Sequence, residues 1–279
     1  MSGWELVIDG FGRLEAPCVD PSGGLCFADM LEPGTVRRLE PDGSVTEVAQ
    51  RDHVGGLVPH VDGGLLASGH DLAVLEDDGS VRTVLEPSGG WGFNDLTTDA
   101  HGNVYVGMHG ERPSAELPAV SASLWIVRPG GRATHCYDGI QMTNGIGLSP
   151  DGTRLHHVDT LSRTIWVSDV GEDGLPVHRR ALYGVPYGSP DGLAIDEAGG
   201  IWIAVVGAGR VVRLAPDGVE DLVLEAPSAW VSSLCFGGGD GRDLFITTFG
   251  GAPYDPGRSG AVHRTRVATP GAPVHPARV

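Results

Sequence analysis

Short apolar runs alternate with glycine-containing turns along the whole chain, and this pattern recurs six times. Each recurrence is a turn followed by an apolar run, at residues 21–29, 61–69, 99–107, 150–159, 197–205 and 239–247. The matching turn glycines are Gly23, Gly63, Gly102, Gly152, Gly199 and Gly241, which are 40, 39, 50, 47 and 42 residues apart. Intervals of this size are typical of one four-stranded blade of a β-propeller.

A second series of turns lies between the first, at residues 40–45, 76–81, 128–133, 171–176 and 215–220. Asp-Gly and Gly-Gly pairs supply the positive φ angles of tight hairpins, and the β-branched runs between them suit half-buried strands. Two hairpins per repeat make four strands, and no helical pattern of ten or more residues is present. The sequence therefore predicts an all-β fold, a six-bladed β-propeller with four antiparallel strands per blade.

The two ends of the chain carry separate predictions. The sixth repeat ends with the segment 261–267 and has no fourth strand after it, whereas residues 4–10 resemble the outer strands of other repeats. We expect this N-terminal strand to complete the last blade and to close the ring, which hides a sheet edge. Residues 1–279 are then a single domain, and about 268–279, with three prolines, are expected to be a loose tail.

Composition excludes several classes of function. The chain has no lysine, and 19 arginines against 36 acidic residues give a formal charge of −17. Such a charge repels nucleic acid and anionic membranes, and the lack of lysine excludes Schiff-base chemistry and a P-loop. The four cysteines have no metal-type spacing and are expected to be buried free thiols. A small-molecule substrate is the expected partner.

No leader or membrane span is recognisable. The first ten residues lack the basic and apolar regions of a secretory signal, and no apolar run reaches eighteen residues. We therefore expect a cytoplasmic protein. A closed propeller covers its own sheet edges, so a monomer or weak homo-oligomer is expected.

Polar residues recur at one position of the repeat. Eight residues before the turn glycines stand Glu15, Gly55, Asn94, Asn144, Asp191 and Ser233. The innermost strands of a propeller line its channel, so these residues should form a ring. Buried oxygens without partners cost on the order of 1–3 kcal/mol each. All-oxygen donors suit one hard divalent cation, with Ca²⁺ favoured and Mg²⁺, Mn²⁺ or Zn²⁺ possible.

Each of these residues also has an ordinary interpretation. The pairs Asn144-Gly145 and Asp191-Gly192 are common turn dipeptides, Asn94 could cap a turn, and Glu15 could be a solvated loop carboxylate. The shared offset from an independent landmark is what favours a metal site at the channel mouth.

The motifs around these positions resemble the gluconolactonase, SMP-30 and regucalcin family over essentially the whole chain. They are Glu15-Ala16-Pro17, Phe93-Asn94-Asp95, Thr143-Asn144-Gly145, Pro190-Asp191-Gly192 with the following 193–196, and Cys235-Phe236-Gly237-Gly238. The resemblance implies a six-bladed propeller with a divalent metal bound by Glu15, Asn144 and Asp191. Asn94 matches a position that binds substrate or metal, and in the related diisopropyl fluorophosphatase type four such side chains surround calcium. Most known members hydrolyse sugar lactones, and some hydrolyse other lactones or organophosphates.

One departure concerns substrate recognition. Sugar lactonases often carry an arginine two residues before the Asn of their Asn-Asp pair, and here that residue is Gly92. The resemblance also places substrate contacts near Glu111 and Arg112 after the third-repeat strand. His109 and His70 end equivalent strands, so both are candidate substrate contacts at the rim, although a surface loop position is the more common one for such histidines.

The expected activity is metal-dependent lactone hydrolysis. The cation would polarise the carbonyl and activate water, with Asp191 as ligand first and general base second. No GxSxG or HExxH motif supports a serine hydrolase or zinc protease. Two other classes stay open: a non-catalytic binding propeller, and a propeller enzyme of other chemistry, such as organophosphate hydrolysis or the condensation carried out by strictosidine synthase-like proteins.

Overall fold

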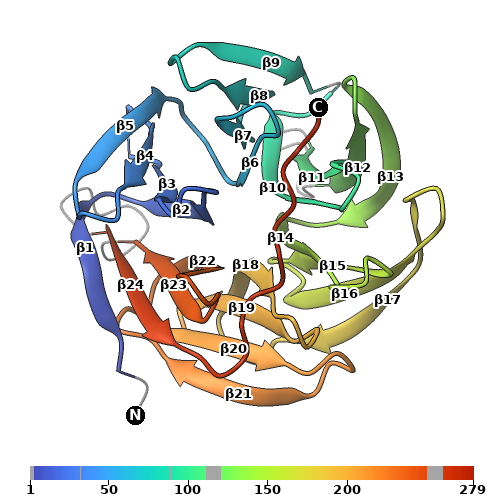
Figure 1. Cartoon of the computed structure of the whole chain (residues 1–279). Coiled ribbons are helices and arrows are strands. Elements are labelled where there is room, and N and C mark those ends of the chain that lie inside the picture. Colours follow the sequence, from blue (N-terminus) through green and yellow to red (C-terminus); the bar gives the residue numbers. More distant parts are fainter. Residues whose placement is uncertain (1–2, 32, 88, 111–120, 250–259) are drawn as a thin grey trace, which may run out of the picture.

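The computed structural model describes residues 3–31, 33–87, 89–110, 121–249 and 260–279. These residues form strands β1 to β24 in six four-stranded antiparallel sheets, and no helix occurs among them. The sheets stand as blades around a central axis (Figure 1). The predicted all-β, six-bladed propeller is confirmed.

Each blade runs outward from the axis in chain order. Blades 1 to 3 consist of β2 (Leu14–Val19), β3 (Leu25–Asp29), β4 (Thr35–Leu39) and β5 (Val45–Gln50); β6 (Leu57–Pro59), β7 (Leu65–Ala67), β8 (Leu72–Leu75) and β9 (Val81–Leu85); β10 (Gly92–Thr98), β11 (Val104–His109), β12 (Ala122–Arg128) and β13 (Arg132–Ile140). Blades 4 to 6 consist of β14 (Thr143–Leu148), β15 (Arg154–Asp159), β16 (Thr164–Val170) and β17 (Pro176–Gly184); β18 (Ser189–Ile195), β19 (Ile201–Val206), β20 (Arg210–Leu214) and β21 (Glu220–Glu225); β22 (Val231–Gly237), β23 (Asp243–Thr248), β24 (Gly260–Arg266) and β1 (Glu5–Phe11).

The turn glycines of the repeat behave as the sequence predicts. All six lie between the first and second strands of a blade and have positive φ, from +68° at Gly241 to +100° at Gly63. The second turn series joins the third and fourth strands of blades 1 to 5. These turns fix the strand boundaries, and therefore the register of each blade.

The N-terminal strand closes the ring. β1 pairs antiparallel with β24, with Glu5 opposite Arg264, and the two side chains form an ion pair at 2.6 Å. The Trp4 indole N–H also donates to the carbonyl oxygen of Glu225 at 2.8 Å, which ties the first strand to blade 5. The last blade is thus completed by the first strand of the chain.

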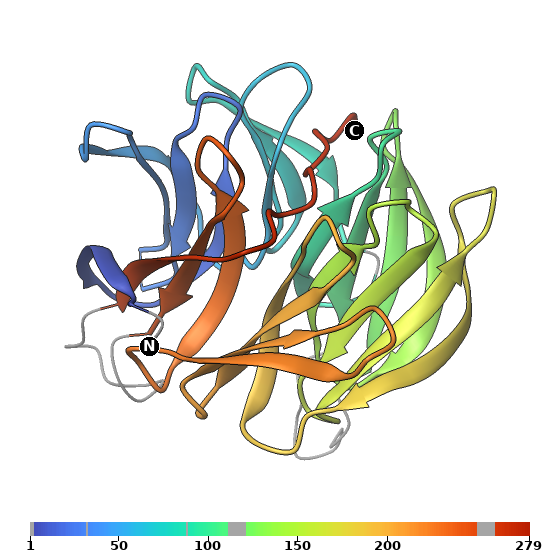
Figure 2. The ribbon, with the colours of Figure 1, turned by 60° about the horizontal axis from the view of Figure 1, so that its bottom comes forward.

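The C-terminal segment corrects the sequence-based expectation. Residues 268–279 are not a loose tail: they cross the face of the propeller where the innermost strands end, and we call residues 270–279 the strap (Figures 1 and 2). Ala272 N–H donates to Ile195 O at 2.9 Å in blade 5, and Ala277 N–H donates to Pro59 O at 2.8 Å in blade 2. The exposed fractions of Ala277 and Val279 are 0% and 8%.

Three prolines keep the strap extended, which suits a segment lying across strand ends. Two more of its N–H groups donate to blade turns, that of Gly271 to Gly241 O at 2.9 Å and that of Arg278 to Gly102 O at 3.0 Å. The opposite face, where the innermost strands begin, is called the site face below. No described segment forms a helix long and apolar enough to cross a membrane.

Removal of residues 274–279 should lower the free energy of unfolding by about 3 kcal/mol or more. The truncation exposes the surface that Val279 covers and removes several buried hydrogen bonds, each contributing about 1 kcal/mol. Urea unfolding followed by intrinsic fluorescence measures the change. Val274, 61% exposed in the same segment, supplies the control, because Val274→Ala should shift stability by less than about 0.5 kcal/mol. Equal unfolding midpoints for the truncated and full-length chains would contradict a structural role for the strap.

Candidate metal and substrate site

The residues at the shared offset all lie at or just before the start of an innermost strand. Glu15 is in β2, Asn94 in β10, Asn144 in β14, Asp191 in β18 and Ser233 in β22, and Gly55 comes two residues before β6. The six innermost strands surround the axis (Figure 1). The six positions therefore follow one another around the axis on the site face, and we call them the ring.

Each polar ring residue coincides with an irregularity in strand pairing. The register shifts fall between Glu15 and Cys18, Phe93 and Leu96, Thr143 and Ile146, Pro190 and Leu193, and Val231 and Ser233. A β-bulge bends its strand and redirects the bulged side chain. The Asn-Gly and Asp-Gly dipeptides therefore sit in bulged strands and not in the turns that their composition alone suggests.

Glycines allow the ring segments of neighbouring blades to approach closely. A Cβ on Gly55 would lie 2.0 Å from Asn94 Oδ1, and one on Gly192 would lie 2.2 Å from Ser233 Oγ. No side chain fits at either position without displacement. The blade 2 position thus holds glycine because the amide of Asn94 occupies the space of its side chain.

The two ring amides are joined directly. Asn94 Nδ2 donates to Asn144 Oδ1 and to Thr143 O, both at 2.7 Å. Asn144 Nδ2 donates in turn to Thr160 Oγ1 at 2.8 Å, and this hydroxyl donates to Pro190 O at 2.8 Å. These bonds fix both amide orientations and link blades 3, 4 and 5 beside the axis.

Hydrogen-bonded side chains next to the ring also hold β14 in place. Thr143 Oγ1 is 2.7 Å from His157 Nε2, and His157 Nδ1 is 2.9 Å from the Tyr137 hydroxyl. Burial lowers the pKa of His157 to about 3, so this imidazole is neutral near pH 7. Its role is to position the strand that carries Asn144.

Three carboxyl groups share the mouth of the channel. Burial raises the pKa of Glu15 well above its ordinary value, and the charges of Asp191 and Asp95 raise it further. Burial also raises the pKa of Asp191 to about 7 and that of Asp95 to about 8. The sequence analysis quoted Asp95 in a motif but did not name it as a site residue; its place directly after Asn94 was the available signal.

The predicted rim residues meet different outcomes. His109, the last residue of β11, is buried and stacks on Trp91 with ring centroids 4.8 Å apart, and burial lowers its pKa to about 4. His70 is exposed and packs edge-on against His53 at 4.6 Å, and His53 contacts Trp91 at 5.9 Å. His109 therefore belongs to a packed group of rings and not to a surface loop. Glu111 and Arg112 lie outside the described residues.

Gly92 occupies a position where a side chain is excluded. Its φ is +150°, and a Cβ there would lie 2.6 Å from Gly69 O and 3.2 Å from His70 Cα. Phe93 N–H donates to the same Gly69 carbonyl at 2.7 Å, so the main chain of blade 2 fills this space. An arginine two residues before Asn94 would not fit this backbone.

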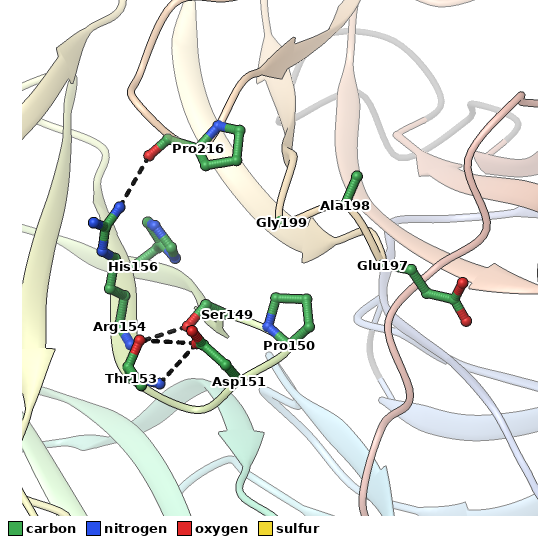
Figure 3. A pocket seen from close by; sticks show the side chains of 10 residues that line it. All are labelled: Ser149, Pro150, Asp151, Thr153, Arg154, His156, Glu197, Ala198, Gly199 and Pro216. Carbon is green, nitrogen blue, oxygen red and sulfur yellow. Dashed lines mark hydrogen bonds between the residues drawn. The ribbon is translucent and has the colours of Figure 1, made fainter.

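A hollow of about 330 Å³ lies away from the ring, between blades 4 and 5 beside the strap (Figure 3). Its walls include Asp151, whose carboxylate accepts from Ser149 Oγ at 2.6 Å and from Thr153 Oγ1 at 2.8 Å within one hairpin turn. These bonds lower the pKa of Asp151 to about 2. No ring residue lines this hollow, and we assign it no chemistry.

Comparison with known proteins gives consistent likenesses. The family model of the SMP-30/gluconolactonase/LRE-like region matches residues 14–250. A 6-deoxy-6-sulfogluconolactonase of Pseudomonas putida is 32% identical over 264 residues, covering 88% of each chain. A pentonolactonase of Haloferax volcanii is 30% identical over 258 residues, covering 88% of this chain and 84% of its own.

A solved structure supports the same fold. The calcium-binding protein regucalcin of Agrobacterium tumefaciens superposes with a TM-score of 0.86 at 22% identity, covering 100% of this chain and 98% of its own. Because the family match spans most of the sequence and the sulfogluconolactonase is 32% identical over most of its length, the chain belongs to the SMP-30/gluconolactonase/LRE-like family.

Proposed function

We propose that this protein hydrolyses a lactone at the mouth of its channel, with a divalent cation held by Glu15, Asn144 and Asp191. The convergence of two carboxylates and one oriented amide from three blades carries the proposal. The lactonase names of two relatives at 32% and 30% identity support the reaction class. The name of the calcium-binding regucalcin favours Ca²⁺ as the first cation to test.

The residues at the mouth fit such a cation. Glu15 and Asp191 are like charges that raise the cost of ionisation at the ring, and a cation between them would offset this cost. Among the described residues no group of three or more His, Cys, Asp or Glu is arranged to hold a metal, so the amide oxygen of Asn144 is needed as a further donor. When bound, a divalent cation supplies Lewis acidity toward the ester carbonyl and lowers the pKa of water.

The chain's own residues divide the remaining work. Burial raises the pKa of Asp191 to about 7 in the metal-free protein, and a cation would lower it, so that Asp191 would be ionised and able to accept a proton from the attacking water. Asn94 holds the amide of Asn144 in place, and Thr160 holds it from the other side. Trp91 lies three residues before Asn94, and its ring stacks on that of His109, which pairs with Gly92 across β10 and β11. Substrate substituents would lie against these two rings.

Asp191→Asn and Glu15→Gln should each lower lactone hydrolysis by at least about 10²-fold, because each replaces a charged ligand by a neutral amide that binds a divalent cation more weakly, and Asp191→Asn also removes the proposed base. A lactone panel assayed with and without chelator, alongside circular dichroism of each variant, measures this. Asp151→Asn, on the strap face, is the matched control and should keep activity. Full turnover in both ring variants would rule out this mechanism, and a wild-type protein that binds Ca²⁺ but hydrolyses no lactone would favour a binding propeller.

The metal-free protein should lose stability as pH rises from about 4 to about 8. Asp191 and Asp95 have pKa values of about 7 and about 8 in the folded state, against about 3.9 in the unfolded chain, so the folded state binds more protons in this window. Thermal unfolding in chelator across this pH range measures the slope. Asp191→Asn should flatten it, and Ca²⁺ should stabilise the wild type most at the alkaline end. A slope of opposite sign would show that these carboxyls are not held against ionisation.

A further inference from the structure

The main chain of Arg13 is held in place two residues before the ring residue Glu15. In the same way, Met142 stands two residues before Asn144. The Arg13 N–H donates to Asp29 Oδ1 at 3.1 Å, and the Met142 N–H donates to Asp159 Oδ1 at 3.0 Å. Both aspartates end the second strand of their blade. The main chain of Arg13 is therefore held by a backbone-to-carboxylate hydrogen bond that recurs at the equivalent position of blade 4.

The guanidinium of Arg13 lies over an aromatic ring and has no ion-pair partner among the described residues. Its Cζ lies 4.5 Å from the centroid of the Phe249 ring, and Arg13 is exposed. Among the residues that the structure describes, no carboxylate lies within ion-pair distance of it, whereas Arg51 pairs with Asp71, and Arg213 with Asp196 at 2.7 Å. Its charge still reaches the ring, because it lowers the pKa of both Glu15 and Asp191.

No other blade has an arginine two residues before its ring position. The residues two places before the ring positions are Arg13, His53, Gly92, Met142, Ser189 and Val231. The backbone of blade 2 excludes any side chain at Gly92, so blade 3 cannot supply one in this conformation. Arg13 thus holds a guanidinium over Phe249, within electrostatic reach of Glu15 and Asp191, in a chain whose formal charge is −17.

We propose that Arg13 recognises a negatively charged oxygen group on the substrate, so that the site selects lactones bearing a carboxylate or a similar oxyanion. The strongly acidic surface disfavours anionic ligands, and a fixed guanidinium at the mouth reverses this preference locally. Guanidinium and carboxylate match in geometry and form two parallel charge-assisted hydrogen bonds. This inference rests on the proposed lactone hydrolysis and specifies its substrate class.

The test compares two lactones of the same ring size that differ in one group. D-Glucaro-1,4-lactone carries a carboxylate where D-glucono-1,4-lactone carries a hydroxymethyl group. We expect the wild type to show the higher kcat/KM for the anionic lactone. Arg13→Met should lower the ratio of the two kcat/KM values by about tenfold to a hundredfold, as expected for a lost charge-assisted hydrogen bond, and Arg13→Lys should recover part of it.

Arg210→Met is the matched control. Arg210 also lies over an aromatic ring, with its Cζ 4.8 Å from the Tyr187 centroid, but it pairs with Glu225 at 2.9 Å on the outer part of blade 5. Its loss should leave the selectivity ratio unchanged. An unchanged ratio in Arg13→Met, or an equal loss for both lactones together with weaker Ca²⁺ binding, would overturn the proposal, since the second result would make Arg13 only a charge balance for the ring.

Failure of the proposed function is distinguishable from failure of this inference. If the wild type hydrolyses neither lactone, calorimetric binding of D-glucarate and D-gluconate, with Ca²⁺ present, decides the role of Arg13. Tighter binding of D-glucarate that Arg13→Met removes would retain Arg13 as an anion-recognition residue. Equal binding of the two acids by the wild type would reject it.

Discussion

Packing between neighbouring blades is the constraint on which the rest of the structure depends. The buried apolar residues form six clusters, and each cluster joins two adjacent blades. A blade that is apolar on both faces needs a neighbour on each side, so the series of sheets has to close on itself. Closure by β1 against β24 follows from this need, and it brings the starts of all six innermost strands to one place.

Regular strands in this arrangement direct their side chains toward the neighbouring blades. The site departs from this arrangement locally. Bulges redirect the ring side chains toward the axis, and Ala16, next to Glu15, adopts φ of +51° there. A non-glycine residue in this conformation costs of order 1–3 kcal/mol. Together with the mutual repulsion of Glu15 and Asp191, this makes the ring conformation unfavourable by itself. The stability of the surrounding frame offsets that cost.

The periodicity of the sequence predicted both the blades and the ring because one spacing encodes both. Gly23 and Glu15, for example, lie on the same hairpin, so their fixed offset survives folding. Features outside the repeat were not predictable in this way. The strap has no counterpart in other repeats, and its proline-rich composition suggested a loose tail although Ala277 is completely buried. The amide orientations of Asn94 and Asn144 depend on Thr160, which follows a different strand.

Substrate choice, like the strap, depends on residues outside the repeat. Five of the six ring positions carry a side-chain oxygen at an equivalent register shift, whereas the residues two places before the ring differ in every blade, from the guanidinium of Arg13 to the excluded side chain of Gly92. Relatives at about 30% identity can therefore share the fold and the ring while differing at the mouth. In the proposed reaction, the repeat places the groups that act on the lactone, and the non-repeating residues before the ring select which lactone is bound.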